Sequence, residues 1–259
     1  MPAEVRVATL NLFNNPHGRW ADREALVHEQ AVALDADVLA LQECDLAGDQ
    51  VERLLAALGP TYTAVRLRNP NEASIKSLAV VTRLAVEGED ACTDLGSGDI
   101  ALRARLAGGL EVITTHLHFG PSRRGSEIRA VQVRKLLSWI GPVSTGRRLV
   151  LCGDFNAGPR GENIKAIKQL LRSTHEEVHG DEPEWTHPTG LVRIIDAQAA
   201  FGVPVLPESK GHAIDYLFVA PDIGVRDCRV TFDRPHPDEP GLFPSDHVGL
   251  VADLSVPSP

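Results

Sequence analysis

The chain has 259 residues, of which 43% are hydrophobic and 24% are charged, a composition typical of a globular protein rather than a disordered one. Its 35 acidic residues outnumber its 26 basic residues, and the net charge of −9 disfavours tight, sequence-independent binding to nucleic acid, because such binding depends on basic surface. No apolar run approaches the roughly 20 residues that span a bilayer.

The remaining global features favour one cytoplasmic domain over residues 1–259. The opening segment, MPAEVRVATLNLF, carries an acid and a base within its first six positions and lacks the apolar core of a secretion signal. The cysteines show no C-x-x-C and no metal-finger spacing, which predicts reduced, buried thiols; they are Cys44, Cys92, Cys152 and Cys228. The sequence does not indicate an oligomeric state.

The first half of the chain alternates predicted strands with amphipathic helices. Apolar segments bounded by turn residues predict strands over 5–12, 38–43, 78–82 and 110–116. A helix is expected from Asp22 to about Leu34, and a second over 49–58, where Gly59 is placed to end it. The Gly- and Asp-rich stretch 87–99 is expected to form a hairpin-type connection.

The second half repeats this organisation around a long irregular segment. Helices are predicted over 126–140 and 162–172, and strands over 148–154, 213–219 and 248–254. Residues 173–210 are rich in proline and give no clear pattern, and a second proline-rich loop covers 233–244. Many strands and fewer helices in mixed order favour two packed sheets with helices outside them, an α/β fold.

Polar residues concentrate at the ends of these predicted strands. They are Asn11, Glu43, His116, Asp154, Asn156, Asp215, Asp246 and His247. Each one alone has an ordinary explanation as a turn or cap residue, so the argument depends on the combination. A carboxylate that follows a buried strand must be paired or bind a metal. Carboxylate and amide oxygens suit Mg²⁺ or Mn²⁺ better than Zn²⁺.

The order of six short motifs resembles the endonuclease/exonuclease/phosphatase superfamily, which has the fold of DNase I. The motifs are ATLNL (8–12), LQE (41–43), THL (115–117), GDFN (153–156), IDYLFV (214–219) and PSDH (244–247). They run from the first predicted strand to the last, so the resemblance covers nearly the whole chain. It implies a four-layer αββα sandwich, two mixed sheets packed face to face with helices outside, and a metal-dependent phosphoric ester hydrolase.

The resemblance also implies roles for the polar cluster. Asn11 and Glu43 are expected to bind the divalent metal, with Asp246 a further candidate ligand. Asp154 is expected to orient or deprotonate the attacking water, and Asn156 to hold the nucleophile or a phosphate oxygen. Phosphoester cleavage needs an in-line water and charge stabilisation on the phosphoryl oxygens, and these residue types supply both.

The histidines complete the expected site. His247 is expected to contact the scissile phosphate while Asp215 orients its imidazole, and His116 is a second phosphate-contacting histidine. A neighbouring carboxylate fixes the imidazole tautomer and raises its pKa. The general base, Asp154 or His247, stays open.

One departure from the family pattern concerns the partner of His116. DNase-like members place a carboxylate just before the strand that reads KSLAVVTR here, whereas this chain has Lys76 and Ser77 there, with Glu72 farther upstream. The partner of His116 is therefore an open question. Arg83, at the end of that strand, is expected to form structural ion pairs.

The loop after His116 offers candidate substrate contacts. Arg123, Arg124 and Arg129 are expected either to meet an anionic substrate at the rim of the site or to form the solvated start of a helix. His118 completes an H-x-H pattern, but the sequence after it does not continue as a zinc hydrolase motif would.

The superfamily does not fix the substrate. Negative net charge and few aromatic residues favour a small phosphorylated metabolite, a lipid head group or a nucleotide. The alternatives are a nuclease acting on DNA or RNA, which needs a basic groove, a sphingomyelinase-like phosphodiesterase, and a non-catalytic binding protein on the same fold.

Overall fold

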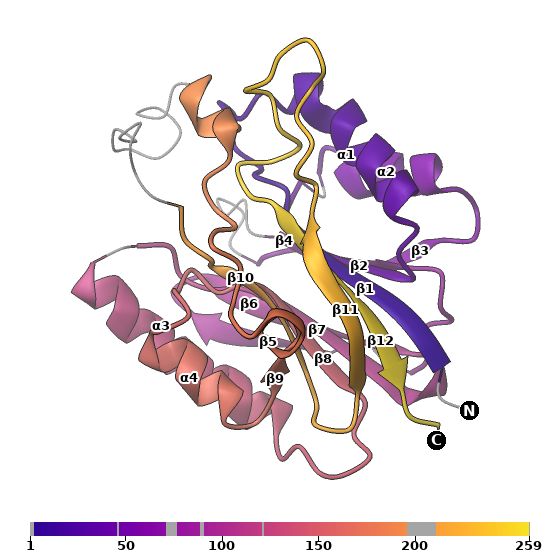
Figure 1. Ribbon diagram of the computed structural model, residues 1–259, viewed down its shortest axis with the longest axis vertical. Coiled ribbons are helices and arrows are strands. Elements are labelled where there is room, and N and C mark those ends of the chain that lie inside the picture. The colour runs from indigo at the N-terminus through magenta and orange to yellow at the C-terminus, as the bar shows by residue number, and fades with distance from the viewer. Residues whose placement is uncertain are drawn as a thin grey trace.

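Two six-stranded mixed sheets lie face to face, and helices cover their outer sides (Figure 1). The computed structural model describes residues 3–45, 47–70, 77–88, 91–120, 122–195 and 211–258. The predicted α/β sandwich with helices outside is therefore confirmed.

The first sheet contains both the first and the last strand of the chain. Its order is β11-β12-β1-β2-β4-β3, and its strands are β1 (Ala3–Asn11), β2 (Val38–Cys44), β3 (Thr63–Leu67), β4 (Ser77–Thr82), β11 (Gly224–Thr231) and β12 (Gly249–Val256). Strand β1 is antiparallel to β12, with Ala3 opposite Val256, and parallel to β2. The carboxyl ends of β1 and β2 consequently meet at one edge of the sheet.

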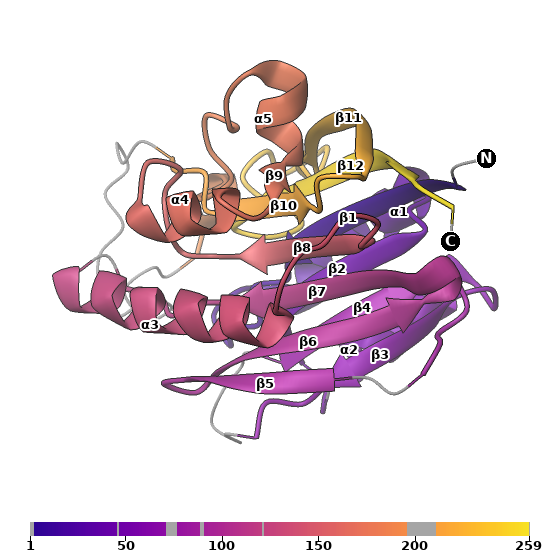
Figure 2. The same cartoon turned by 90° about the horizontal axis from the view of Figure 1, so that it is seen from below.

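The second sheet has the order β5-β6-β7-β8-β10-β9, which Figure 2 displays from β5 at the lower edge up to β10. Its strands are β5 (Ala91–Gly96), β6 (Asp99–Leu106), β7 (Leu110–His116), β8 (Leu149–Asp154), β9 (Arg172–Ser173) and β10 (Asp215–Val219). A short 3-10 turn, η1 (Ala107–Gly109), joins β6 to β7. Strands β7 and β8 are parallel, whereas β10 is antiparallel to β8.

The space between the sheets is filled by aliphatic side chains. The buried cluster there combines residues of both sheets, among them Val7, Val38, Val80, Val112 and Val150. Burial of each such side chain stabilises the fold by about 1.5–3 kcal/mol. The polar residues of the candidate site lie outside this apolar layer, at the ends of the strands.

The helices cover the two outer faces. Helices α1 (Trp20–Leu34) and α2 (Gln50–Leu58) pack on the first sheet, and α3 (Arg123–Ile140) and α4 (Glu162–Lys168) pack on the second. Figure 1 places the first pair at the upper right and the second pair at the lower left, with the strands between them. The helix α5 (Thr174–His179) lies against β11 and β10. None of the described helices is long and apolar enough to cross a membrane.

Several predicted boundaries need correction. The helix expected from Asp22 begins at Trp20. The helix expected over 126–140 begins at Arg123, because the Ser122 side chain accepts a hydrogen bond from the Gly125 amide and caps it. The helix expected over 162–172 ends at Lys168, since Arg172 pairs with β10 as part of β9.

The segments without a clear sequence pattern hold further elements. The expected connection over 87–99 contains β5, which pairs with the unpredicted β6. Strands β3 and β11 were also not predicted. The irregular stretch 173–210 contains α5 and η2 (Gly190–Arg193); its residues 196–210 lie outside the described part of the chain.

The thiols follow the prediction with one exception. All four cysteines are free, and Cys44, Cys152 and Cys228 are buried, but Cys92 on the edge strand β5 is exposed.

Candidate active site

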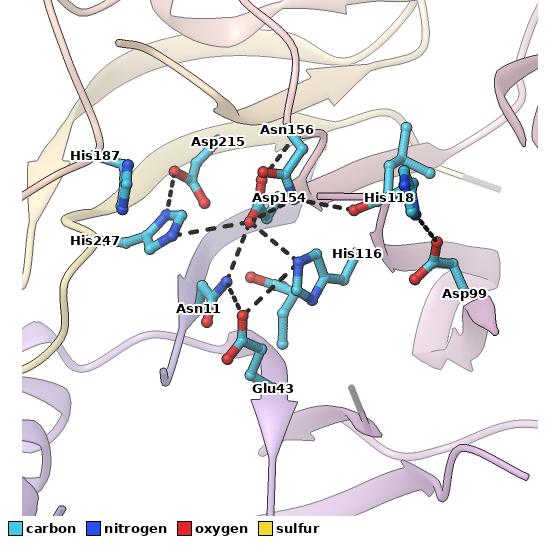
Figure 3. A network of polar contacts seen from close by, with 12 residues as sticks. Asn11, Glu43, Asp99, His116, His118, Asp154, Asn156, His187, Asp215 and His247 are labelled. Carbon is cyan, nitrogen blue, oxygen red and sulfur yellow. Dashed lines mark hydrogen bonds and ion pairs between the residues drawn. The ribbon is translucent and has the colours of Figure 1, made fainter. Parts of the chain in front are cut away.

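The polar residues of the strand ends converge on one carboxylate oxygen, Oδ2 of Asp154 (Figure 3). Asn11 Nδ2 lies 3.1 Å from this atom and Asn156 Nδ2 lies 3.2 Å from it. His116 Nε2 is at 3.4 Å and His247 Nε2 at 3.8 Å. Side chains from both sheets and from the loop before β12 thus meet at one point.

The sheet register explains this convergence. In the second sheet, Asp154 at the end of β8 is directly opposite His116 of β7 on one side and Asp215 of β10 on the other. In the first sheet, Asn11 pairs with Gln42, one residue before Glu43. Because the sheets face each other, these two ends form one buried cluster of polar side chains, called the polar pocket below.

Glu43 is held in this pocket by Asn11. Asn11 Nδ2 donates to Glu43 Oε1 at 3.0 Å, and His116 Nε2 is 3.8 Å from the same oxygen. Asn11 Oδ1 accepts a hydrogen bond from the amide of Phe13 at 2.9 Å. The amide nitrogen of Asn11, rather than its oxygen, therefore faces the carboxylates of Glu43 and Asp154.

Two of the site residues have left-handed backbone conformations. Glu43 has φ 52° and Asn156 has φ 48°, a region that costs free energy for residues other than glycine and often occurs at functional sites. Asn156 also donates its backbone N–H to Asp154 Oδ1 at 2.8 Å. Both side chains take part in the cluster, since Glu43 Oε1 accepts from Asn11 Nδ2 and Asn156 Nδ2 donates to Asp154 Oδ2.

Gly153, the residue before Asp154, permits the close approach of β8 to β7. Its φ is +131°, and a Cβ atom there would lie 2.1 Å from the carbonyl oxygen of Thr115. A side chain at this position would push the two strands apart next to the site. The glycine of the GDFN motif is thus a steric requirement of the sheet.

A second buried pair is formed by His247 and Asp215. His247 Nδ1 is 2.8 Å from Asp215 Oδ2, and Thr186 Oγ1 donates to the same carboxylate oxygen at 2.6 Å. The Nε2 atom of His247 is left facing Asp154.

The loop that carries Asp246 and His247 is tied to β1. Ser245 Oγ donates to the carbonyl oxygen of Asn11 at 2.6 Å and accepts from the His247 amide at 3.2 Å. The buried Arg23 of α1 donates to the carbonyl oxygens of Pro244 at 2.7 Å and Leu12 at 2.8 Å.

Arg23 is a residue that the sequence analysis missed. It is fully buried, and burial lowers its pKa to about 10, partly offset by the carboxylates of Asp246 and Glu43. It therefore remains positively charged at neutral pH beside the acidic pocket. The feature of the sequence that could have identified Arg23 is its position on the helix face that also carries Leu26 and Val27.

Burial and mutual repulsion shift the pKa values of the acidic groups. Burial, followed by the charge of Asp246, raises the pKa of Glu43 to about 7. Burial and the charge of Asp215 raise the pKa of Asp154 well above its usual value. The pocket thus holds carboxylates whose ionisation the protein alone does not stabilise.

The imidazole of His247 responds to the same surroundings. Burial acts to lower its pKa, but the carboxylates of Asp215 and Asp246 outweigh burial and raise it well above the usual value. Burial acts to raise the pKa of Asp246, but His247 and His187 outweigh it, so that carboxyl group titrates below its usual range.

His187 is a second residue that the sequence analysis missed. Its Nε2 atom is 3.4 Å from Asp246 Oδ2, and its ring lies 4.6 Å from the His247 ring. It sits in the proline-rich segment, where the sequence gives no periodic pattern.

The three arginines expected at the rim differ in their surroundings. The Arg123 side chain is 93% exposed and pairs with Glu127, and Arg124 is exposed. Arg129 is buried, and its Nη1 donates to the carbonyl oxygens of His118 and Gly120 at 2.8 Å each. Arg129 therefore fixes the loop after His116.

Two open questions about the strand near residue 80 are partly answered. Among the described residues, the carboxylates of Glu43 and Asp154 lie near His116; Glu72 and Lys76 lie outside the described residues. Arg83 forms structural ion pairs, as predicted, with Asp37 at 2.7 Å and with Asp35.

Comparison with known proteins agrees with this fold and these motifs. The model of the Endonuclease/Exonuclease/phosphatase family matches residues 8–247, and the chain belongs to this family. Nocturnin of Drosophila melanogaster is 27% identical over 280 residues, which cover 93% of this chain and 42% of that protein. Human 2',5'-phosphodiesterase 12 is 28% identical over 159 residues, which cover 55% of this chain and 26% of that protein.

The chain thus spans less than half the length of these two relatives. Among solved structures, the human Nocturnin catalytic domain with a bound sulfate anion superposes with a TM-score of 0.72 at 22% identity, covering 99% of this chain and 97% of that domain. The superfamily and the sandwich fold expected from the motifs are both confirmed.

Proposed function

We propose that this protein is a divalent-metal-dependent phosphoric ester hydrolase that cleaves its substrate by in-line attack of water. The observation that carries the proposal is the arrangement around Asp154 Oδ2, where two amides and two imidazoles lie within 3.8 Å. A carboxylate held in place by amides suits the binding of a water molecule. Imidazoles beside it suit a phosphoryl group.

The donor set fits Mg²⁺ or Mn²⁺. Glu43, Asp154 and Asp246 offer carboxylate oxygens, the ligands that these cations prefer. The raised pKa values of Glu43 and Asp154 indicate uncompensated negative charge, which a divalent cation would neutralise. Glu43 and Asp246 would hold the ion, and Asn11 would orient Glu43 through its amide nitrogen. The bound cation would supply charge stabilisation for the phosphate oxygens.

We assign the remaining roles, binding of the water and of the scissile phosphate, to side chains of the protein. Asp154, positioned by Asn11 and Asn156, holds the attacking water and accepts its proton. His247 lies among the carboxylates of Asp154, Asp215 and Asp246, which favour its cationic form. We therefore assign His247 Nε2 to the scissile phosphate, with His116 as a second contact.

We further propose a small nucleotide-derived phosphodiester as the substrate class. The net charge of −9 disfavours long polyanions. A relative whose name describes phosphodiester hydrolysis, 2',5'-phosphodiesterase 12, makes short nucleotide diesters the first class to test.

The test is hydrolysis of bis-(p-nitrophenyl) phosphate, with and without Mg²⁺ or Mn²⁺, followed by a panel of nucleotide diesters, sugar phosphates and lipid head groups. Metal-dependent release of nitrophenol supports the proposal, and the absence of hydrolysis with every divalent metal and every substrate contradicts it. Efficient nicking of supercoiled plasmid that weakens steeply with salt would replace the small substrate by nucleic acid.

A further inference from the structure

We propose that His187, Asp246 and His247 form a binding site for a transition-metal ion such as Zn²⁺, adjacent to the carboxylate centre of Glu43 and Asp154. Figure 3 displays His187 beside His247, on the side of the cluster away from Glu43. The proposal concerns a second cation site, with ligands of a different chemistry from those assigned to Mg²⁺ or Mn²⁺ above.

The three side chains already have separations suited to one ion. Each offers one ligand atom, and these atoms lie within 4.8 Å of one another. His187 Nε2 is 3.4 Å from Asp246 Oδ2, and His247 Nε2 is 3.9 Å from Asp246 Oδ1. In a tetrahedral zinc site with bonds of about 2.1 Å, neighbouring ligand atoms are about 3.4 Å apart. Small side-chain rotations would therefore close the site.

The chemical types of the three ligands favour a transition-metal ion over Mg²⁺. Two imidazoles and one carboxylate bind Zn²⁺, Co²⁺ and related ions more tightly than Mg²⁺, which prefers oxygen ligands alone. The neighbouring centre offers the carboxylate oxygens of Glu43 and Asp154. The two places thus differ in chemistry although they share Asp246.

Each ligand residue also contacts a group that would not touch the ion and that helps to hold the residue in place, as is usual for metal ligands in proteins. Asp215 holds Nδ1 of His247, and the ion would bind Nε2 in place of the proton that the cationic imidazole carries there, which is released to solvent. Asp246 Oδ1 lies 3.2 Å from Ser245 Oγ, whose one proton is shared with the closer carbonyl oxygen of Asn11 at 2.6 Å. The backbone of His187 is fixed by two hydrogen bonds with His212, at 2.7 and 3.1 Å.

A competing set, made of Asp154, Asp215 and His247, also has suitable separations. In that set, however, Asp215 Oδ2 already receives the hydrogen bonds of His247 Nδ1 and Thr186 Oγ1. The set with His187 leaves these bonds intact, so it is the better candidate.

The exposed fractions of the two histidine side chains indicate how an ion would reach the site. The His187 side chain is 25% exposed, whereas that of His247 is 6% exposed, so an ion would approach past His187. Once bound, it would occupy His247 Nε2, the atom assigned to the scissile phosphate. Inhibition by Zn²⁺ is therefore expected; this consequence, unlike the binding itself, rests on the proposed function.

The binding test uses Co²⁺ as a visible-light probe and Zn²⁺ as a competitor, both added to the full chain. The background carries His179→Asn, which removes one of two further histidines that lie close together, His175 and His179, with ring centroids 4.3 Å apart. In this background, His187→Asn keeps an amide that can face Asp246 but removes the imidazole. His212→Asn is the matched control, since His212 is exposed and lies opposite His187 in the same bridge.

We expect His187→Asn to weaken the tightest Co²⁺ site about tenfold or more, whereas His212→Asn leaves it unchanged. Equal Co²⁺ affinity in the two variants would overturn the site. Circular dichroism checks that both variants fold.

The second test measures Zn²⁺ inhibition of Mg²⁺-dependent hydrolysis, with each variant compared with its own uninhibited turnover. Resistance confined to His187→Asn supports the inhibitory role, and equal inhibition of all variants overturns it. If no variant hydrolyses any substrate, the proposed function fails, and the Co²⁺ spectra still decide whether the metal site exists.

Discussion

His247 Nδ1 lies 2.8 Å from Asp215 Oδ2, and both groups are buried. The same carboxylate oxygen accepts a hydrogen bond from Thr186 Oγ1 at 2.6 Å. These contacts fix the tautomer and the direction of the imidazole, so Nε2 is presented to the pocket. The chemistry proposed for His247 depends on this pair.

Asp215→Asn is expected to lower turnover by about 100-fold or more, because an amide can donate to Nδ1 and stabilise the wrong tautomer. The loss should appear in kcat rather than in KM, measured with a nitrophenyl diester. Thr186→Ser, which keeps the hydroxyl, should retain turnover. A kcat for Asp215→Asn within tenfold of wild type would contradict the positioning role.

Asp154→Ala and His247→Ala are each expected to lower turnover by about 1000-fold or more while the protein stays folded, since each removes a group assigned to water or phosphate. Steady-state kinetics with thermal melts as the control would check this. Activity within about tenfold of wild type in either variant would refute the assigned roles.

Glu43→Gln is expected to raise the Mg²⁺ or Mn²⁺ concentration needed for half-maximal activity by about tenfold or more. The amide keeps the shape of the side chain but removes the charge that holds the cation. The matched control is Glu52→Gln, on the outer surface of α2. An unchanged metal dependence would remove Glu43 from the ligand set.

The stability of the metal-free protein should fall as the pH rises from about 4.5 to 7. In that range the unfolded chain releases the Glu43 proton, whereas the folded protein, in which the pKa is about 7, retains it. Folding therefore binds protons, and raising the pH disfavours folding. His247 acts in the same direction, since its raised pKa stabilises the fold only while the imidazole is charged.

Each unit of pKa shift corresponds to about 1.4 kcal/mol, or about 3–6 °C in Tm for a domain of this size. Melting curves at pH 5 and pH 7.5, with chelator and with Mn²⁺, would measure the effect. Mn²⁺ should raise Tm more at pH 7.5 than at pH 5. A chelated protein that is more stable at pH 7.5 would contradict this account.

Gly153→Ala is expected to destabilise the fold by about 2–4 kcal/mol, from a strained φ and a clash with the Thr115 carbonyl. Gly158→Ala is the matched control, because a Cβ there meets nothing within 4 Å. Urea unfolding of both variants would show the difference; a neutral Gly153→Ala would mean that β7 and β8 can separate without cost.

The sequence predicted the fold best where burial on one face gave a regular pattern. Strand β6 was not predicted although Ile100, Leu102 and Leu106 are two or four residues apart and all lie in the core between the sheets; the arginines between them obscure this pattern. Its Arg103 is accommodated by lying over the Trp139 ring at 4.3 Å and beside Glu111 at 3.4 Å, contacts that depend on residues far along the chain.

The residues of the candidate site were likewise predictable only where a short stretch of sequence carries the signal. Residues in short motifs, such as Asp154 and His247, were identified, and the structure brings them together. Arg23 and His187 were missed because their roles arise only from tertiary contacts. The orientation of the Asn11 amide, which is set by the Phe13 N–H, is equally invisible in a linear pattern.

The pairing of β1 with β12 brings the first and last described strands side by side (Figures 1 and 2). Asn11 precedes β2 and His247 precedes β12, so the site forms only after the whole stretch of chain between these two residues has been synthesised and folded. A polypeptide that stops before Asp246 would lack two of the site residues. Recovery of the proposed hydrolysis during refolding would then report the pairing of β12 with β1.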